Sequence, residues 1–459
     1  FFKQKTAYEI RNCDWSSDVC SSDLPALHAA AADGAAVVPL FVVDPAFARA
    51  GRPRQRFMAA ALDALDDSMG RALVYRHGDP RVVVPALCRE VGATEVHVTA
   101  DHGPYGRQRD AAVADALRTD AVRLVVTGSN YAVAPGTVLK NDGTPYAVFT
   151  PFSKAWRAVG WSAPLGVPDV RWRGAPDVRC DGPPLLEASG DEPTWPLSPT
   201  TEDEAHDRWA EFLPAAADYA DRRDLPAVDG TSRLSAAIRW GVVHPRQLLH
   251  DLGDERGHTV FSSELGWREF YADVLFRRPD SAWNNLDRRM DAMQVDTDAA
   301  ARARFARWAA GATGYPIVDA GMRQLAATGW MHNRVRMLVA SFLVKDLHLP
   351  WQWGARHFMQ HLVDGDLASN QHGWQWAAGT GTDAAPYFRV FNPTTQAHRF
   401  DPDGEYVRRW VPELAGIAGG VVHEPGLLRP DSYPTPMVDH GAERDEALAR
   451  YRQVTAGSR

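Results

Sequence analysis

The spacing of hydrophobic residues changes along the chain. Between Pro25 and Tyr131, short β-branched runs alternate with stretches of helical periodicity, such as 55–69 and 82–91. The strand-like runs are VVPLFVV from Val37, LVY from Leu73, EVHVTA from Glu95 and VRLVVTG from Val122. This alternation is typical of a parallel sheet with helices on its faces. We therefore predict an α/β domain over residues 25–131.

From Thr201 onward almost every apolar residue follows a helical period. The stretch before it, 163–199, is rich in Pro and Gly and has little periodicity, which is typical of a linker. A chain of 459 residues also exceeds what a single core usually holds. We predict a linker over 132–200 and a helical domain over 201–459.

Two of the predicted helical segments carry an unusual density of polar groups. A helix over 333–347 places Asn333 and Met337 on one face and Arg336 about a quarter-turn away. In the next segment Asp364, Asp366 and Asn370 precede Trp374 and Trp376. For any one of these residues, a salt bridge or core packing is the commoner explanation. Together they favour a ligand pocket, because buried polar groups are costly without partners.

Composition excludes several classes of protein. Hydrophobic residues make up 45% and charged residues 24%, as in globular proteins. No run of eighteen apolar residues exists, so we predict no membrane span. The net charge of −8 argues against a uniformly basic protein that coats nucleic acid. Arginines near the predicted pocket could still form a local positive surface. No G-x-G-x-x-G follows a strand, and no P-loop is present.

The four cysteines are Cys13, Cys20, Cys88 and Cys180, and none shows C-x-x-C spacing. We therefore predict neither a metal site nor a disulfide framework. Reduced thiols are expected in a cytoplasmic protein.

Four longer segments resemble the photolyase/cryptochrome family, specifically the class I cyclobutane pyrimidine dimer DNA photolyases. They are YADRRDLPAVDGTSRLSAAIRWGVVHPRQ from Tyr219, ELGWREFY from Glu264, TGYPIVDAGMRQLAATGWMHNR from Thr313 and FNPTTQAHRFDPDGEYVRRWVPEL from Phe391. The resemblance extends from about residue 25 to the C-terminus. It implies a Rossmann-like antenna domain, a linker and an all-α FAD-binding domain in a monomeric DNA-repair enzyme.

By this resemblance the helical domain holds reduced, non-covalent FAD. Hydroxyls and backbone N–H groups at the start of a helix can bind phosphates. The segment TSRLS taken alone is more typical of an ordinary helix N-cap. Arg336 and Asp364 would form a buried ion pair beside the flavin ring. Asn370 would lie near flavin N5, where an amide donates a hydrogen bond but does not readily release a proton. The implied FAD contacts are Tyr219, Thr231, Ser232, Arg233, Leu234, Ser235, Trp330, Arg336, Asp364, Asp366 and Asn370.

The resemblance also implies the lesion contacts: two aromatic faces, two hydrogen-bonding side chains and a methionine. They are Glu264, Trp267, Asn333, Met337 and Trp376. Three arginines would contact the DNA backbone: Arg223, Arg334 and Arg389. For each one alone, an ordinary solvent-exposed arginine is the alternative interpretation. Trp374 and Trp351 would begin an electron relay, but Asp298 stands where the relatives have its third tryptophan.

The implied reaction is light-driven repair of cyclobutane pyrimidine dimers in DNA. Two alternatives from other classes are a cryptochrome-like blue-light sensor that binds FAD without repair and a flavin-free nucleic-acid-binding protein. The motif PYGRxRD, with Gly106, favours 8-hydroxy-5-deazaflavin over methenyltetrahydrofolate as antenna chromophore.

Residues 1–24 fit neither the family nor their surroundings, and they lack the apolar core of a signal peptide. The family places its first strand here. We therefore expect a non-native leader, and a central strand of the first domain that is missing or poorly replaced.

Overall fold

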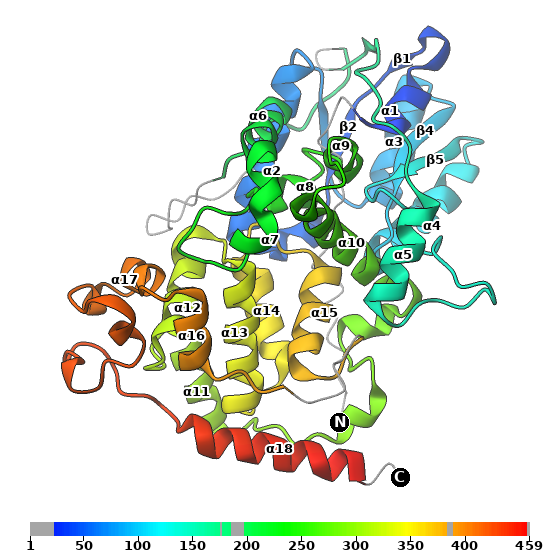
Figure 1. Ribbon diagram of the computed structural model, residues 1–459. Helices are drawn as coiled ribbons and strands as arrows, with labels where there is room; N and C mark the ends of the chain where they lie inside the picture. The colour runs from blue at the N-terminus through cyan, green and yellow to red at the C-terminus, as the bar shows by residue number, and fades with distance from the viewer. Residues whose placement is uncertain (1–22, 175–176, 185–196, 383–388, 457–459) are drawn as a thin grey trace.

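Parallel strand pairs and helices build the N-terminal part of the chain. The computed structural model describes residues 23–174, 177–184, 197–382 and 389–456 (Figure 1). The strands are β1 (Ala36–Val37), β2 (Leu40–Val43), β3 (Val74–His77), β4 (Glu95–Ala100), β5 (Arg123–Ser129) and β6 (Arg171–Trp172). The helices here are α1 (Pro25–Ala30), α2 (Arg52–Ser68), α3 (Pro80–Val91), α4 (Pro104–Arg118) and α5 (Phe149–Val159). The predicted α/β domain is confirmed.

Local sequence explains where these helices begin and end. In α3 the Asp79 carboxylate accepts a hydrogen bond from the backbone N–H of Arg81, and Pro80 occupies the first helical position. Gly92 ends the helix in the left-handed conformation, at φ 72°. A capping aspartate, a proline inside the start and a glycine at the end are the signals that a helix of this length requires.

Within the described residues the strands do not form one continuous sheet. β2 pairs with β3, β4 pairs with β5, and β1 pairs with β6, each pair being parallel. The parallel pairing agrees with the sequence pattern. The expectation that a central strand is missing or poorly replaced falls on residues 1–24, of which 1–22 lie outside the described residues, so it stays a prediction.

The predicted linker differs from the structure. Residues 149–159 form helix α5, which packs on the long helix α10 (Arg256–Arg277). Phe149 stacks on Trp267 with ring centroids 3.8 Å apart, and Trp156 is fully buried. Phe149, Phe152 and Trp156 recur at helical spacing, so the apolar face was present in the sequence. Part of the predicted linker is therefore a packed element between the two domains.

The rest of the chain is helical, as predicted (Figure 1). Besides α10 it contains α6 (Glu202–Phe212), α7 (Tyr219–Arg222), α8 (Ser235–Arg239), α9 (Pro245–His250), α11 (Ala299–Ala309), α12 (Pro316–Thr328), α13 (Asn333–Ser341), α14 (Trp351–His361), α15 (Leu367–Ala378), α16 (Pro393–Phe400), α17 (Glu405–Trp410) and α18 (His440–Ala456). The helix predicted over 333–347 is α13 followed by a π-helical turn, Phe342–Asp346. No helix in the described ranges is long and apolar enough to cross a membrane.

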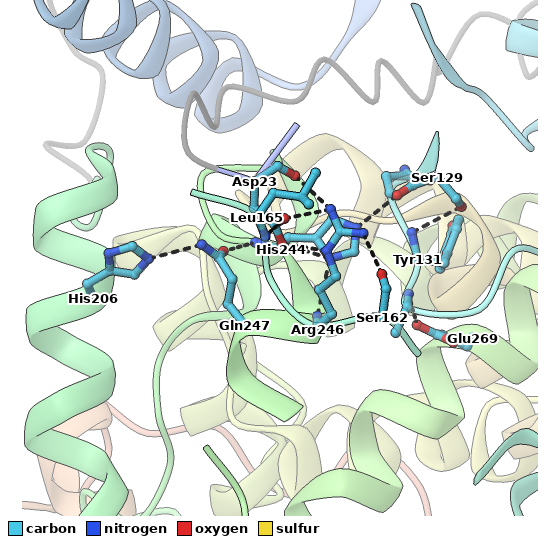
Figure 2. Close-up of polar contacts among 12 residues, drawn as sticks. Asp23, Ser129, Tyr131, Ser162, Leu165, His206, His244, Arg246, Gln247 and Glu269 are labelled. Carbon is cyan, nitrogen blue, oxygen red and sulfur yellow. Dashed lines mark hydrogen bonds and ion pairs between the residues drawn. The ribbon is translucent and has the colours of Figure 1, made fainter. Parts of the chain in front are cut away.

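A buried polar cluster joins the first described residues to α9 (Figure 2). Both oxygens of the Asp23 carboxylate accept hydrogen bonds from Arg246, at 2.5 and 2.6 Å, and one also accepts from the N–H of Leu165 at 2.7 Å. Burial lowers the pKa of His244 to about 4. The neutral ring then accepts from the N–H of Arg246 and donates to the carbonyl of Ser129 at 2.8 Å.

The last two residues of the predicted leader lie within the described fold. The Asp23 side chain is fully buried in its ion pair, and Leu24 is the N-cap residue of α1. The non-native leader stays a prediction. The rest of the predicted leader, residues 1–22, lies outside the described residues.

We predict that Asp23→Ala lowers the free energy of unfolding by about 3–5 kcal/mol, because it leaves the buried guanidinium of Arg246 without its charge partner. Urea denaturation followed by circular dichroism measures this. The matched control is Asp63→Ala, which removes an exposed pair with Arg71 and should cost less than about 1 kcal/mol. Equal effects of the two substitutions would contradict the anchoring role of Asp23.

Candidate functional site: a helical flavin and lesion site

The segment predicted to contact the FAD phosphates lies between α7 and α8. Arg233 adopts a left-handed conformation, at φ 57°, and its guanidinium lies 3.8 Å from the ring centroid of Trp330. The Trp330 indole donates to the Ser235 hydroxyl at 3.3 Å. Leu234 is fully buried and anchors the loop. The structure therefore brings Trp330 from the loop before α13 against the predicted phosphate segment, although the two are about a hundred residues apart.

Two arginine–aspartate pairs hold the turn between α14 and α15. Arg336 Nη2 lies 2.8 Å from Asp364, and its Nε donates to the carbonyl of Met331 at 2.7 Å. Arg239 donates to the carbonyl of Gly365 at 3.1 Å and lies 4.0 Å from Asp366. The predicted pairing of Arg336 with Asp364 is present.

Asp366 is also the N-cap residue of α15. Its carboxylate accepts from the backbone N–H of Ser369 at 2.7 Å and so caps the helix. Burial alone would raise the pKa of Asp366, but Arg239 and Arg268 outweigh burial and hold that pKa below its usual value. The carboxylate stays charged, which fixes the first turn of α15.

Asn370 projects from that first turn. Its amide nitrogen donates to the carbonyl of Ala355 at 3.0 Å and to the Gln371 side chain at 2.8 Å. The side chain is half-buried and held by α14. Its orientation is therefore set by protein contacts.

The predicted lesion contacts lie on three helices. Glu264 and Trp267 project from α10, Asn333 and Met337 from α13, and Trp376 from α15. Helix α15 packs against both α10 and α13. Asn333 is exposed and the other four side chains are half-buried. One face of Trp267 is covered by Phe149.

Two of the three predicted DNA-contacting arginines are paired with carboxylates. Arg223 lies 2.5 Å from Glu264, and Arg334 lies 2.7 Å from Asp224. Burial opposes the charge of Arg223, but Glu264 outweighs this and raises the pKa of Arg223. Arg389 is exposed. Sequence reasoning had linked neither arginine to an acidic partner.

The predicted relay tryptophans are both buried. Trp374 has ring contacts with Trp308, at a centroid distance of 6.1 Å, and with Phe358, at 5.0 Å. Trp351 donates its indole N–H to Asn285 at 2.8 Å. Asp298, which replaces the expected third tryptophan, caps α11 through the N–H of Ala301. The relay remains a prediction.

Sequence reasoning missed three charged residues of this site: Arg239, Arg268 and Asp224. The first two influence Asp366, and the third pairs with Arg334. Arg239 could have been found from the sequence. It stands beside Trp240 in a helix whose other residues are typical of a hydrophobic core, and a charged residue at such a buried position is unusual.

Comparisons with known proteins agree with this arrangement. A family model for the FAD binding domain of DNA photolyase matches residues 261–453, and a DNA photolyase model matches residues 15–169. A deoxyribodipyrimidine photo-lyase of Streptomyces griseus is 41% identical over 96% of this chain and 98% of its own length. The chain belongs to the DNA photolyase family. The Escherichia coli K12 photo-lyase is 39% identical over 88% of this chain and 90% of its own length.

Solved structures of the family have the same fold. A class III photolyase from Agrobacterium tumefaciens aligns with a TM-score of 0.84 and 35% identity over 96% of each chain. A Sulfolobus tokodaii photolyase, described with two FAD molecules, aligns with a TM-score of 0.82 and 26% identity over 95% of this chain and 98% of its own. The predicted order of an α/β domain and a helical FAD-binding domain is confirmed.

The side chains at this site are chemically suited to FAD. The segment predicted to contact the phosphates carries the hydroxyls of Thr231, Ser232 and Ser235, and Arg336 and Asp364 form a charged pair. Two buried polar atoms, Trp374 Nε1 and His332 Nε2, have no hydrogen-bond partner among the described residues. Burial lowers the pKa of His332 to about 4, so the ring is neutral. A polar cofactor supplies partners for such atoms.

We predict that Asp364→Asn weakens FAD binding roughly tenfold or more, because a hydrogen bond to a charged group is worth about 1.5–3 kcal/mol. The measurement is the absorbance of bound flavin per protein during titration with FAD. Asp287→Asn, which breaks the exposed pair with Arg289, is the control and should leave binding unchanged. If Asp364→Asn binds FAD with unchanged affinity, the Arg336–Asp364 pair does not contribute to the flavin site.

Proposed function

We propose that this protein repairs cyclobutane pyrimidine dimers in DNA, using blue light and reduced FAD. The observation that carries the proposal is the gathering of Glu264, Trp267, Asn333, Met337 and Trp376 on packed helices beside the flavin segment. Relatives at 35–41% identity over nearly the whole chain carry the name deoxyribodipyrimidine photo-lyase. The alternative of a light sensor without repair has less support, because these relatives are named for the lyase.

The aromatic side chains bind the lesion by stacking. The half-buried Trp267 stacks on Phe149 and is proposed to stack on a base, and Trp376 supplies a second indole. Stacking of a base on an aromatic ring is worth roughly 1–3 kcal/mol. A dimer pairs poorly with the opposite strand, so flipping it out of the duplex costs only about a few kcal/mol. Stacking therefore offsets the cost of extrusion, while Met337 packs against the lesion with a soft, polarisable surface.

Hydrogen-bonding side chains orient the lesion and stabilise charge that develops on it. Glu264 and Asn333 reach toward the pyrimidine edges from α10 and α13. Arg223 already holds Glu264 in one orientation, at 2.5 Å. Arg334 and the exposed Arg389 are proposed to contact DNA phosphates, and such backbone contacts position the duplex.

FAD would be held by the residues of the flavin site, and in its reduced form it would supply the light-driven electron transfer that splitting the dimer requires. Asn370 is held by Ala355 and offers an amide that does not supply a proton. The Arg336–Asp364 pair fixes the charge distribution beside the flavin ring. The remaining proposed contacts, Tyr219, Thr231 to Ser235, Trp330 and Asp366, bind and orient the cofactor.

The α/β domain is proposed to hold an antenna pigment, 8-hydroxy-5-deazaflavin rather than methenyltetrahydrofolate. Support comes from the PYGRxRD motif, in which Gly106 replaces a bulkier residue. Gly106 also has a packing role, because a Cβ there would collide with the carboxylate of Asp101. Arg109 of the same motif lies 3.3 Å from Asp101.

The proposal is tested with an oligonucleotide containing one thymine dimer and protein carrying reduced FAD. We predict that the dimer is converted to two thymines under near-ultraviolet or blue light and persists in darkness. Chromatography of the digested oligonucleotide measures both species. Repair in darkness, or no repair in light with flavin bound, would rule out this function.

We predict that Trp267→Ala weakens binding of dimer-containing DNA by roughly 1–3 kcal/mol, about tenfold or more in dissociation constant. Affinity for undamaged DNA, which depends on backbone arginines, should change far less. Fluorescence anisotropy with matched duplexes measures both. Trp161→Ala, which removes a half-buried indole packed on Trp156, is the control and should affect neither. Parallel loss of both affinities in Trp267→Ala would indicate a structural role.

A further inference from the structure

Two histidines lie one turn apart on α14. His357 and His361 occupy positions i and i+4, which share one face of a helix. Their rings stack with centroids 4.0 Å apart and an interplanar angle of 29°. Both residues are half-buried. We call them the α14 histidine pair. Neither belongs to the proposed repair site, so their role does not rest on the proposed function.

A backbone hydrogen bond orients the ring of His361. Its Nδ1 lies 2.8 Å from the carbonyl oxygen of His357, and because a carbonyl only accepts, Nδ1 carries the proton. In the neutral ring the lone pair is then on Nε2, which has no hydrogen-bond partner among the described residues. Histidines that bind metals commonly donate their other ring N–H to a carbonyl or carboxylate in this way.

The ring of His357 is held by aromatic rings of α11. Its centroid lies 5.4 Å from that of Trp308 and 6.0 Å from that of Phe305. Burial lowers the pKa of His357 to about 3, and the neighbouring His361 acts in the same direction. The ring is therefore neutral, which is the form that binds metals. Within the described part of the chain neither of its nitrogens has a hydrogen-bond partner.

The spacing of the pair suits a metal ion bound by both rings. Histidines at i and i+4 of a helix reach a single ion, as in H-E-x-x-H zinc sites. Two imidazoles bound at about 2.0–2.1 Å, near a right angle, place their centroids roughly 4–5 Å apart. The observed separation of 4.0 Å is close to this. Imidazole nitrogen suits Ni²⁺, Cu²⁺ and Zn²⁺, whereas Mg²⁺ and Ca²⁺ prefer oxygen ligands.

We propose that the α14 histidine pair chelates one divalent transition-metal ion, Ni²⁺, Cu²⁺ or Zn²⁺, through one nitrogen of each ring. Within the described residues no group of three or more histidine, cysteine or carboxylate side chains is placed to hold a metal, so water completes the coordination. Of the three ions Cu²⁺ binds most tightly, by the general order of stability for such ligands. The cysteine spacing, from which no metal site was predicted, does not detect a pair of histidines.

Binding is tested with Cu²⁺ and untagged full-length protein. Isothermal titration calorimetry measures the affinity, and electron paramagnetic resonance of the bound Cu²⁺ counts its imidazole nitrogens. We expect a saturable site with two imidazoles. Zn²⁺ should raise the melting temperature, because an ion that binds only the folded state stabilises it, and Mg²⁺ should not. Absence of saturable binding, or a spectrum with fewer than two imidazoles, would overturn the proposal.

Substitutions locate the site. His357→Ala and His361→Gln each leave one ring, so each should weaken Cu²⁺ binding roughly tenfold or more and remove the two-imidazole spectrum. The control His250→Ala removes an exposed histidine of α9 and should change neither. Circular dichroism of the metal-free variants checks their fold. His361→Gln decides the question alone if His357→Ala does not fold, and Cu²⁺ binding by folded His361→Gln at wild-type affinity would contradict the assigned site.

Discussion

Two buried arginine–aspartate pairs, Arg336 with Asp364 and Arg239 with Asp366, are the contacts on which the catalytic half of this protein depends. They hold the tight turn before α15 against α13 and α8, which are separate segments of the sequence. A buried charge without a partner is costly, so the turn has one stable arrangement. That arrangement orients Asn370, Trp374 and Trp376, because all three project from α15. The proposed flavin and lesion contacts are thus held by electrostatics as much as by packing.

The α/β domain contributes to this site indirectly. Phe149 of α5 covers one face of Trp267, and Glu269 of α10 accepts hydrogen bonds from the backbone of Ala132 and Val133 and from the Trp156 indole. Burial raises the pKa of Glu269 to about 7. These contacts and the Asp23–Arg246 pair join the two domains through α5, α9 and α10.

Much of the fold follows from local patterns. The alternation of β-branched runs and helical stretches placed β2 to β5 and α2 and α3, and the polar residues in α13 and α15 indicated a ligand site. Helix α5 was not predicted. Its apolar face, Phe149 to Trp156, lies next to a Pro- and Gly-rich stretch, and the whole region was therefore interpreted as a linker. The pairing of Arg223 with Glu264 was beyond prediction, since the residues lie 41 positions apart and salt bridges have no sequence period. The family resemblance supplied the residue roles, which no spacing rule provides.

The central claim is that a flipped-out dimer binds between the indoles of α10 and α15, beside the flavin. The most direct measurement is a crystal structure of the flavin-bound protein with a duplex containing one thymine dimer. We predict the dimer outside the base stack of the duplex, with one base against Trp267, Trp376 on the other side of the dimer, and Glu264 and Asn333 at the pyrimidine edges. A dimer that remains stacked in the duplex, or one bound against another surface, would contradict this account.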